Sequence, residues 1–199
     1  MKVEIIAKTT GDPLSFVGSV AGASYGKDDP SRKRAVRCFE LGHMSVFEHV
    51  SATWHIEGIS RACSHQLVRH RLASYCQLSQ RYVKVDTGED WYVKPPIADY
   101  SRSVRFDQLM ELFGNHYKYL INAGMKPEDA RYVLPEATKT NINVTMNMRE
   151  FASFYAARTD KAAQWEIREL AEEMCGELQL LGGEWKDLTE LIEEVRNGD

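Results

Sequence analysis

Apolar and polar residues alternate in several stretches of the chain, and this alternation predicts β-strands with one buried face. Apolar side chains occupy every second position from Val50 to Ile56 and again from Ile142 to Met146. The stretch from Val3 to Ala7 is rich in β-branched residues and predicts a further strand. Residues 82–99 contain Asp-Thr-Gly and Pro-Pro signals, which predict a loop with short strands.

Helical patterns fill most of the N-terminal region between these strands. Residues 13–26 are rich in small residues and predict a loose helix. A second helix is expected to start at Asp29-Pro30-Ser31, with Asp29 as its N-cap and proline in its first turn, and to end at Gly42. The segment from Gly42 to His49 is then expected to be a turn crowded with polar side chains.

Ser60 is expected to cap a helix that carries two different faces. Apolar side chains share one face, and basic ones recur at the same spacing on the other: Ile59, Cys63 and Leu67, then Arg61, His65 and Arg69. Residues 72–81 follow, and their polar composition predicts an irregular segment.

The C-terminal half is predicted to be mainly helical. A long helix ending at Gly124 should carry an apolar stripe formed by Phe106, Leu109, Met110, Phe113, Tyr117 and Leu120. A short helix should begin at Pro127, run through Leu134 and stop at Pro135. Asn147, with Glu150 three residues later, is expected to cap the next helix. Another amphipathic helix ends at Gly182-Gly183, and its apolar residues are Ile167, Leu170, Ala171, Met174, Leu178 and Leu181. A short acidic helix follows it.

Composition narrows the fold and function classes. The chain has 199 residues and a net charge of −4, which argues against a general nucleic-acid coat. It contains no apolar run of the roughly 18–20 residues that a membrane span needs and no signal-peptide core. Without repeats or a recognisable linker, the sequence predicts one α+β domain over residues 1–199. Its four cysteines show no CxxC spacing, so reduced thiols in the cytoplasm are expected.

The segment from Arg69 to Arg81 concentrates the anion-binding side chains of the chain: Arg69, His70, Arg71, Ser74, Ser79 and Arg81. Guanidinium groups bind phosphate oxygens bidentately, and serine hydroxyls add further donors. The pattern therefore indicates either an anion site or a solvated basic face. Neither a Walker loop nor a G-x-G-x-x-G turn is present, so side chains would have to hold a phosphate here.

Arg158 lies on an apolar helical stripe, four residues after Phe154 and seven after Phe151. A buried arginine must be paired or used, whereas one at a helix end can extend past its aromatic neighbours to water. Both interpretations remain open from the pattern.

Histidines and cysteines do not have the spacing of a standard zinc site, so no metal is expected. The relevant residues are His43, His49, His55, His65, His70, Cys63 and Cys76. Cys76 is the only plausible cysteine nucleophile, because it lies beside the arginines.

The basic pattern R-H-R-x-x-S-x(4)-S-x-R at residues 69–81 is one of six ordered blocks between about residues 42 and 168. The others are Gly42-His43-x-Ser45-x-Phe47-Glu48-His49, Gln66-x-x-Arg69, Ala130-Arg131-x-x-Leu134-Pro135, Asn147-x-Arg149, and Arg158 with Ala163-Gln164-Trp165-Glu166-Ile167. Together they resemble the flavin-dependent thymidylate synthases, the ThyX family.

The resemblance implies a homotetrameric α+β enzyme with a small, mostly antiparallel sheet packed by several helices and with active sites between subunits. It implies reductive methylation of dUMP to dTMP, with 5,10-methylenetetrahydrofolate as carbon donor and NADPH-reduced FAD as reductant. No cysteine nucleophile is used in such a reaction. The implied partners are dUMP, folate, NADPH and further copies of the chain, with neither nucleic acid nor membrane.

The resemblance also assigns site residues by position. It implies FAD binding by Ser45, Arg69, His70, Arg71, Gln77, Asn147, Arg149, Ser153 and His43. It implies dUMP binding by Gln66, Arg69, Ser79, Gln80, Arg81, Arg131, Arg158 and Glu48. Arg158 is also the implied catalytic residue, because a fixed cation stabilises a uracil that ionises at N3.

Two positions depart from the family pattern. Cys76-Gln77 stands where the family often has Asn-Glu, so a neutral amide replaces a carboxylate. Ser153 stands where some members carry an asparagine. Two alternatives follow: an RNA- or nucleotide-binding module without chemistry, and a flavoprotein that has lost methylation through the change at Gln77.

Overall fold

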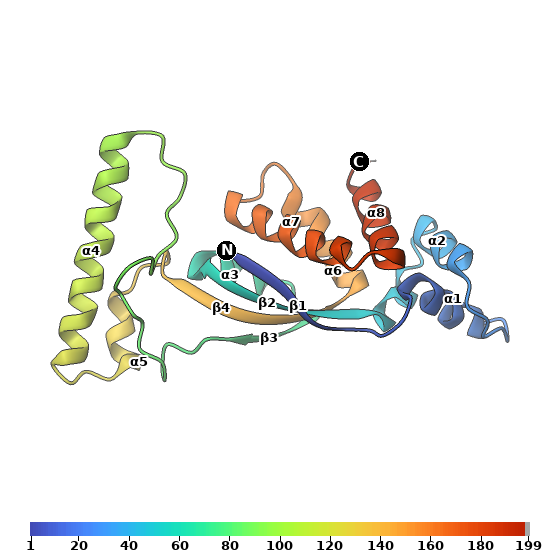
Figure 1. Ribbon diagram of the computed structural model, residues 1–199, viewed down its shortest axis with the longest axis horizontal. Helices are drawn as coiled ribbons and strands as arrows, with labels where there is room; N and C mark the ends of the chain where they lie inside the picture. The colour runs from blue at the N-terminus through green and yellow to red at the C-terminus, as the bar shows by residue number, and fades with distance from the viewer. Residues whose placement is uncertain (198–199) are drawn as a thin grey trace. The chain divides into compact units, whose positions relative to one another are not determined.

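The computed structural model describes residues 1–197, which form two compact units. Unit 1 comprises Met1–Ile56, Gln66–Cys76 and the described residues from Asn143 onward, and unit 2 comprises Glu57–His65 and Gln77–Ile142. Each unit is therefore assembled from segments that are distant in the sequence. Figure 1 colours these segments from the N-terminus to the C-terminus.

A four-stranded sheet has the order β1-β2-β4-β3. Its strands are β1 (Lys2–Lys8), β2 (Ser51–Ser60), β3 (Ala73–Gln77) and β4 (Lys139–Asn147). The hydroxyls of Thr53 and Thr145 lie 2.9 Å apart, and His55 Nδ1 lies 2.6 Å from Asn143 Oδ1. Positions thus rise along β2 as they fall along β4, so these strands are antiparallel. The expected strands at β1, β2 and β4 are confirmed, and β2 continues beyond the expected end to Ser60.

The core of unit 1 forms where α6 (Met148–Thr159) and α7 (Trp165–Leu180) pack together and α7 packs against β1 (Figure 1). Fully buried Trp54 stacks on Phe151 with ring centroids 5.2 Å apart and donates its indole N–H to the carbonyl of Met174. The predicted cap of α6 is confirmed, because Asn147 Oδ1 accepts the backbone N–H of Glu150 at 2.9 Å.

The N-terminal helices of unit 1 are α1 (Pro13–Ala23) and α2 (Arg32–Glu40), and the C-terminal helix is α8 (Gly183–Asn197). Gly18 permits a close approach before α2, since a Cβ there would lie 2.0 Å from the carbonyl oxygen of Ser31. The expected N-cap at Asp29 is wrong: Ser31 accepts the N–H of Arg34, while Asp29 pairs with the Arg34 guanidinium.

Unit 2 is organised around α4 (Tyr100–Asn122), followed by α5 (Pro127–Ala130) and the 3-10 helix η2 (Arg131–Val133). The loop before α4 packs on it: Thr87 donates its hydroxyl to the Gly114 carbonyl, and the Tyr117 hydroxyl accepts the N–H of Val85. The expected short strands in this loop reduce to one isolated bridge, Tyr92 with Thr138, within residues 1–197.

The expected apolar stripe of α4 is only partly buried. Met110 and Tyr117 are buried, whereas Leu109 is 49% exposed and its neighbour Leu112 is 50% exposed. The stripe is therefore wider than the surface that unit 2 itself covers.

Two irregular segments expected from the sequence contain regular structure. Residues 73–77 form β3, in which half-buried Ala73, Tyr75 and Gln77 alternate with exposed Ser74 and Cys76. The polar composition hid this period of two. Likewise, the 3-10 helix η1 (Met44–His49) replaces much of the expected turn after Gly42.

The helix predicted after Ser60 is confirmed as α3 (Arg61–Leu67), with the Ser60 hydroxyl accepting the N–H of Cys63 at 2.9 Å. It ends at Leu67, so Arg69 does not continue its basic face. No helix among residues 1–197 is both long and apolar enough to span a membrane.

Candidate functional site

Arg158, near the end of α6, is held by two groups from the segment after α3. Its Nε donates to His70 Nε2 at 2.9 Å, and its Nη2 donates to the backbone carbonyl of Gln66 at 3.3 Å. These bonds use two of the five guanidinium N–H groups. The remaining N–H groups have no partner among the described residues. The protein thus orients Arg158 and leaves guanidinium N–H groups available to donate to a ligand.

His70 is a mostly buried imidazole, with its side chain 13% exposed. Its ring meets Phe154 edge-on at 5.0 Å, and its Nδ1 lies 3.7 Å from the Glu150 carboxylate. Burial, and then the charge of Arg158, lower the pKa of His70 to about 4. His70 is therefore neutral near pH 7. Because Nε2 accepts from Arg158, its proton belongs on Nδ1, toward Glu150.

Tyr75, on β3, supports the same segment. Its hydroxyl lies 2.7 Å from the carbonyl oxygen of His70 and 2.9 Å from that of Leu67, so one proton is shared between them. Burial, and then the Glu150 carboxylate, raise the pKa of Tyr75. Sequence reasoning did not assign Tyr75 or Glu150 to the site. The capping position of Glu150 was visible, but its approach to His70 was not.

A second group of sequence-predicted residues lies at η1 and the start of α6. Glu48 forms an ion pair with Arg149. The Ser153 hydroxyl donates to the Arg149 carbonyl, one turn earlier, at 3.2 Å. With Asn147 at the cap of α6, these residues form a polar surface at the N-terminal end of that helix.

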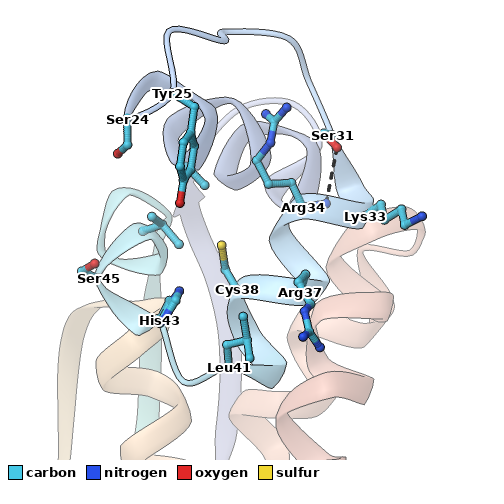
Figure 2. A pocket seen from close by; sticks show the side chains of 12 residues that line it. Ser24, Tyr25, Ser31, Lys33, Arg34, Arg37, Cys38, Leu41, His43 and Ser45 are labelled. Atoms are coloured by element: carbon cyan, nitrogen blue, oxygen red, sulfur yellow. Dashed lines mark hydrogen bonds between the residues drawn. The ribbon is translucent and has the colours of Figure 1, made fainter.

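A cavity of about 570 Å³ opens beside η1, between α1 and α2 (Figure 2). His43 and Ser45 line it at one end, and Figure 2 shows Tyr25 and Cys38 pointing into it. His43 and Ser45 make no side-chain hydrogen bond with any described residue. This cavity combines an aromatic and an aliphatic wall with unused polar groups.

Arg69 and Arg71 are exposed, and their guanidinium groups form no hydrogen bond or ion pair with residues 1–197. A solvated face would give the same exposure. However, two unpaired guanidinium groups two residues apart also fit a diphosphate, whose charges need cations that are not already neutralised.

The remaining sequence-predicted residues lie in unit 2. Arg131 donates its Nε–H to the Glu128 carbonyl at 3.1 Å, and Arg81 donates to the Glu128 carboxylate at 3.3 Å. The Ser79 hydroxyl accepts the backbone N–H of Arg81. Gln80 and Arg131 line a cavity of about 230 Å³, which Arg61 also lines.

Gln77 is bound within unit 2 through its amide nitrogen. Its Nε2 donates to the hydroxyls of Ser64 at 2.8 Å and Thr140 at 3.2 Å. The Ser64 hydroxyl in turn donates to the Arg61 carbonyl, so it can only accept from Gln77. The carbonyl oxygen of the Gln77 amide has no hydrogen-bond partner among the described residues.

The cysteines and histidines do not assemble a metal site within the described part of the chain. Cys63 and Cys175 are buried, and burial followed by the charge of Glu193 raises the pKa of Cys175 to about 12. Cys76 is exposed on β3.

Comparison with known proteins identifies the family. Residues 4–181 match the family model of the thymidylate synthase complementing proteins. The flavin-dependent thymidylate synthase of Pyrococcus furiosus is 42% identical over 171 residues, which are 83% of this chain and 70% of that protein. The corresponding Geobacter sulfurreducens protein is 43% identical over 187 residues, 87% of this chain and 80% of that protein.

A solved structure has the same fold. The Helicobacter pylori flavin-dependent thymidylate synthase ThyX, complexed with FAD and dUMP, superposes with a TM-score of 0.79 at 22% identity, over 98% of this chain and 99% of that one. The chain therefore belongs to the flavin-dependent thymidylate synthase family.

Proposed function

We propose that this chain catalyses the reductive methylation of dUMP to dTMP, the reaction of its family, with Arg158 as the residue that activates the uracil. The carbon donor is 5,10-methylenetetrahydrofolate, and the co-substrate NADPH provides the electrons. When bound, FAD supplies the hydride chemistry. The protein must therefore bind and orient the substrates and stabilise the charge that develops on them.

The main support for this proposal is the orientation of Arg158. A guanidinium with unused N–H groups can meet the negative charge that develops on uracil at N3, which makes the base electron-rich at the carbon to be methylated. His70 fixes the Arg158 plane as a neutral acceptor and adds no second positive charge. Arg158 thus stays oriented without weakening its own electrostatic effect.

The residues present fit FAD. Arg69 and Arg71, which have no ion-pair partner within residues 1–197, suit its diphosphate, and the Gln77 amide oxygen, also without a partner there, can accept a hydrogen bond. We assign FAD binding to Ser45, Arg69, His70, Arg71, Gln77, Asn147, Arg149, Ser153 and His43. Because His70 is mostly buried, we expect it to contribute more by orienting Arg158 than by contacting FAD directly. The cavity beside His43 and Ser45 offers room for the carbon donor.

The residues assigned to dUMP divide between the two units. Unit 1 carries Gln66, Arg69, Arg158 and Glu48, and unit 2 carries Ser79, Gln80, Arg81 and Arg131. A site between subunits would combine unit 1 of one chain with unit 2 of another. The family match from residue 4 to 181 includes both units, which supports one functional domain.

We further propose a homotetramer in the cytoplasm. Half-exposed Leu109 and Leu112 on α4 support self-association, because an apolar stripe wider than its own unit covers favours a second copy as its partner. Sedimentation of the purified enzyme would measure the assembly, and a monomer that retains full turnover would contradict it.

Purified protein tests the function directly. We expect flavin absorbance near one FAD per chain and tritium release from 5-tritiated dUMP that requires both methylenetetrahydrofolate and NADPH. Colourless protein that neither binds FAD nor releases tritium would refute the proposal. NADPH oxidation without dTMP formation would instead favour a flavoprotein that has lost methylation.

A further inference from the structure

We propose that Glu150 is a positioning residue for Arg158: its carboxylate faces the Nδ1–H of His70, fixes that tautomer, and so presents Nε2 to Arg158 as the acceptor. This role rests on the proposed function and deepens it, because the family resemblance leaves Glu150 without a role in the reaction. The three side chains all belong to unit 1. They form a continuous series of carboxylate, imidazole and guanidinium.

Three side chains on one face of α6 contact the His70 ring. Glu150, Phe154 and Arg158 follow one another at intervals of four residues, which places them on the same face of the helix. The ring meets Phe154 edge-on at 5.0 Å. Its Nδ1 lies 3.7 Å from Glu150 Oε1, and its Nε2 accepts from Arg158 Nε at 2.9 Å. The imidazole is therefore held between a carboxylate and a guanidinium.

Glu150 is a buried carboxylate that the reaction does not otherwise use. Its side chain is 11% exposed, and its carboxylate accepts no hydrogen bond from the described residues. Its backbone N–H is already bonded to Asn147 Oδ1 at 2.9 Å. A buried carboxylate is unfavourable unless a charge or a dipole compensates it. Within residues 1–197, His70 Nδ1 is the only basic nitrogen within ion-pair distance of it.

Glu150 and Arg158 require the same tautomer of His70. A proton on Nε2 would face the Arg158 N–H and leave the Nδ1 lone pair facing the carboxylate, so both contacts would be repulsive. A proton on Nδ1 makes both contacts attractive. The 3.7 Å contact is longer than a direct hydrogen bond, so the carboxylate acts by attracting the N–H dipole. Without Glu150, the buried Nδ1–H would have no acceptor within residues 1–197.

The same carboxylate influences the backbone that carries His70. Burial, and then the charge of Glu150, raise the pKa of Tyr75, so the Tyr75 hydroxyl keeps its proton. That hydroxyl lies 2.7 Å from the carbonyl oxygen of His70 and 2.9 Å from that of Leu67. Glu150 therefore favours the donor that holds the His70 backbone as well as the tautomer of its ring.

A purely electrostatic role of Glu150 would have the opposite effect on the rate. A negative charge near Arg158 weakens the positive potential that stabilises the uracil anion, so removing only that charge should speed methylation. Loss of positioning should slow methylation, because Arg158 is then less often in the productive orientation. A purely structural role, in which the carboxylate complements the dipole of α6 from its first turn, predicts altered unfolding with an unchanged rate.

The first test measures single-turnover methylation by FAD-loaded enzyme at saturating dUMP. We expect the rate to fall about 10-fold in Glu150→Leu and about threefold in Glu150→Gln, whose amide oxygen can still accept from Nδ1. The dissociation constant of dUMP should change less than about threefold. Glu184→Gln, which removes a carboxylate from the first turn of α8, is the matched control and should keep the wild-type rate. If Glu150→Leu does not fold, Glu150→Gln decides, because a rate equal to or above wild type overturns the role.

The second test asks whether Glu150 acts through His70. Glu150→Leu should cost about 10-fold in the wild-type background but less than about twofold in enzyme that already carries His70→Leu, because the ring that transmits the effect is then absent. Equal losses in the two backgrounds would overturn the proposal.

The tautomer is measured without turnover. Heteronuclear NMR of isotope-labelled histidine, assigned by comparison with His70→Gln, should show the proton on Nδ1 of His70, and the share of this tautomer should fall in Glu150→Leu. A proton on Nε2 in wild type, or an unchanged share in the variant, would overturn the role and leave the reaction intact. Wild-type enzyme that releases no tritium from labelled dUMP would refute the reaction, whereas the tautomer would still decide whether Glu150 positions His70.

Discussion

Replacing His70 by leucine removes the acceptor that orients Arg158 while keeping an apolar side chain against Phe154. The bond from Arg158 Nε to His70 Nε2 is 2.9 Å long and mostly shielded from water. A buried hydrogen bond with one charged partner is worth about 1.5–3 kcal/mol. If all of that stabilisation is expressed in the transition state, kcat falls about 10- to 100-fold.

His70→Gln is the matched variant, because the amide oxygen of glutamine can replace Nε2 as acceptor. We expect it to keep kcat within several-fold of wild type. Single-turnover methylation of dUMP, with FAD content measured by absorbance, separates orientation of Arg158 from flavin binding. Equal losses in the two variants, accompanied by loss of FAD, would refute the orienting role and favour a direct flavin contact.

The same substitution tests the protonation state of His70. Its folded pKa of about 4 lies below the ordinary value near 6.5, so the unfolded chain binds a proton that the folded chain does not. Stability from this group is therefore fully present above about pH 6.5 and is lost as the pH falls toward 4. At about 1.4 kcal/mol per tenfold change in acidity, the loss is about 3 kcal/mol.

Urea unfolding measures this loss. His70→Gln should lose about 3 kcal/mol less than wild type between pH 7 and pH 4, since glutamine does not titrate. Identical pH dependence of the two proteins would show that His70 is not held neutral. Both proteins must carry saturating FAD, because ligand binding itself adds to the free energy of unfolding.

Three further variants test other parts of the arrangement. Arg158→Lys keeps the charge but loses the fork, so methylation measured by tritium release should fall about 100-fold while FAD stays bound; wild-type turnover would contradict its role. Gln77→Glu should raise turnover if the missing carboxylate limits methylation, but it also places that carboxylate against Ser64, so unchanged or lower turnover would indicate that the amide is adapted to this chain. Gly18→Ala should destabilise the protein by about 1–3 kcal/mol in urea, because its Cβ would collide with the Ser31 carbonyl; unchanged unfolding would show that α1 and α2 separate easily.

Much of the fold could be predicted because its signals are local. The alternation in β4 and the Asn147 cap of α6 lie within a few residues of one another, and both are observed. β3 was missed because its buried face consists of alanine, tyrosine and glutamine, which do not form a conventional apolar stripe. Polarity alone therefore did not distinguish this short strand from a loop.

The site depended on contacts that the sequence cannot measure. Arg158 and His70 are separated by 88 positions, and the helical stripe alone left Arg158 either paired or reaching for water. The resemblance named both residues but gave His70 to the flavin. The hydrogen bond between them indicates that His70 mainly orients Arg158, since the ring nitrogen that accepts from Arg158 is not available to the flavin.

Gln77 shows why a departure from a family pattern must be judged with its neighbours. By sequence it is a lost charge, yet its amide donates to two hydroxyls, and one of them, on Ser64, has already committed its proton to the Arg61 carbonyl. A glutamate would face that oxygen without a donor unless Ser64 turned away, and the turn would remove the hydrogen bond to the Arg61 carbonyl at the start of α3. Position 77 is thus linked through one hydroxyl to Arg61, which lines the same cavity as Gln80 and Arg131, so a substitution at Gln77 should alter dUMP affinity as well as turnover.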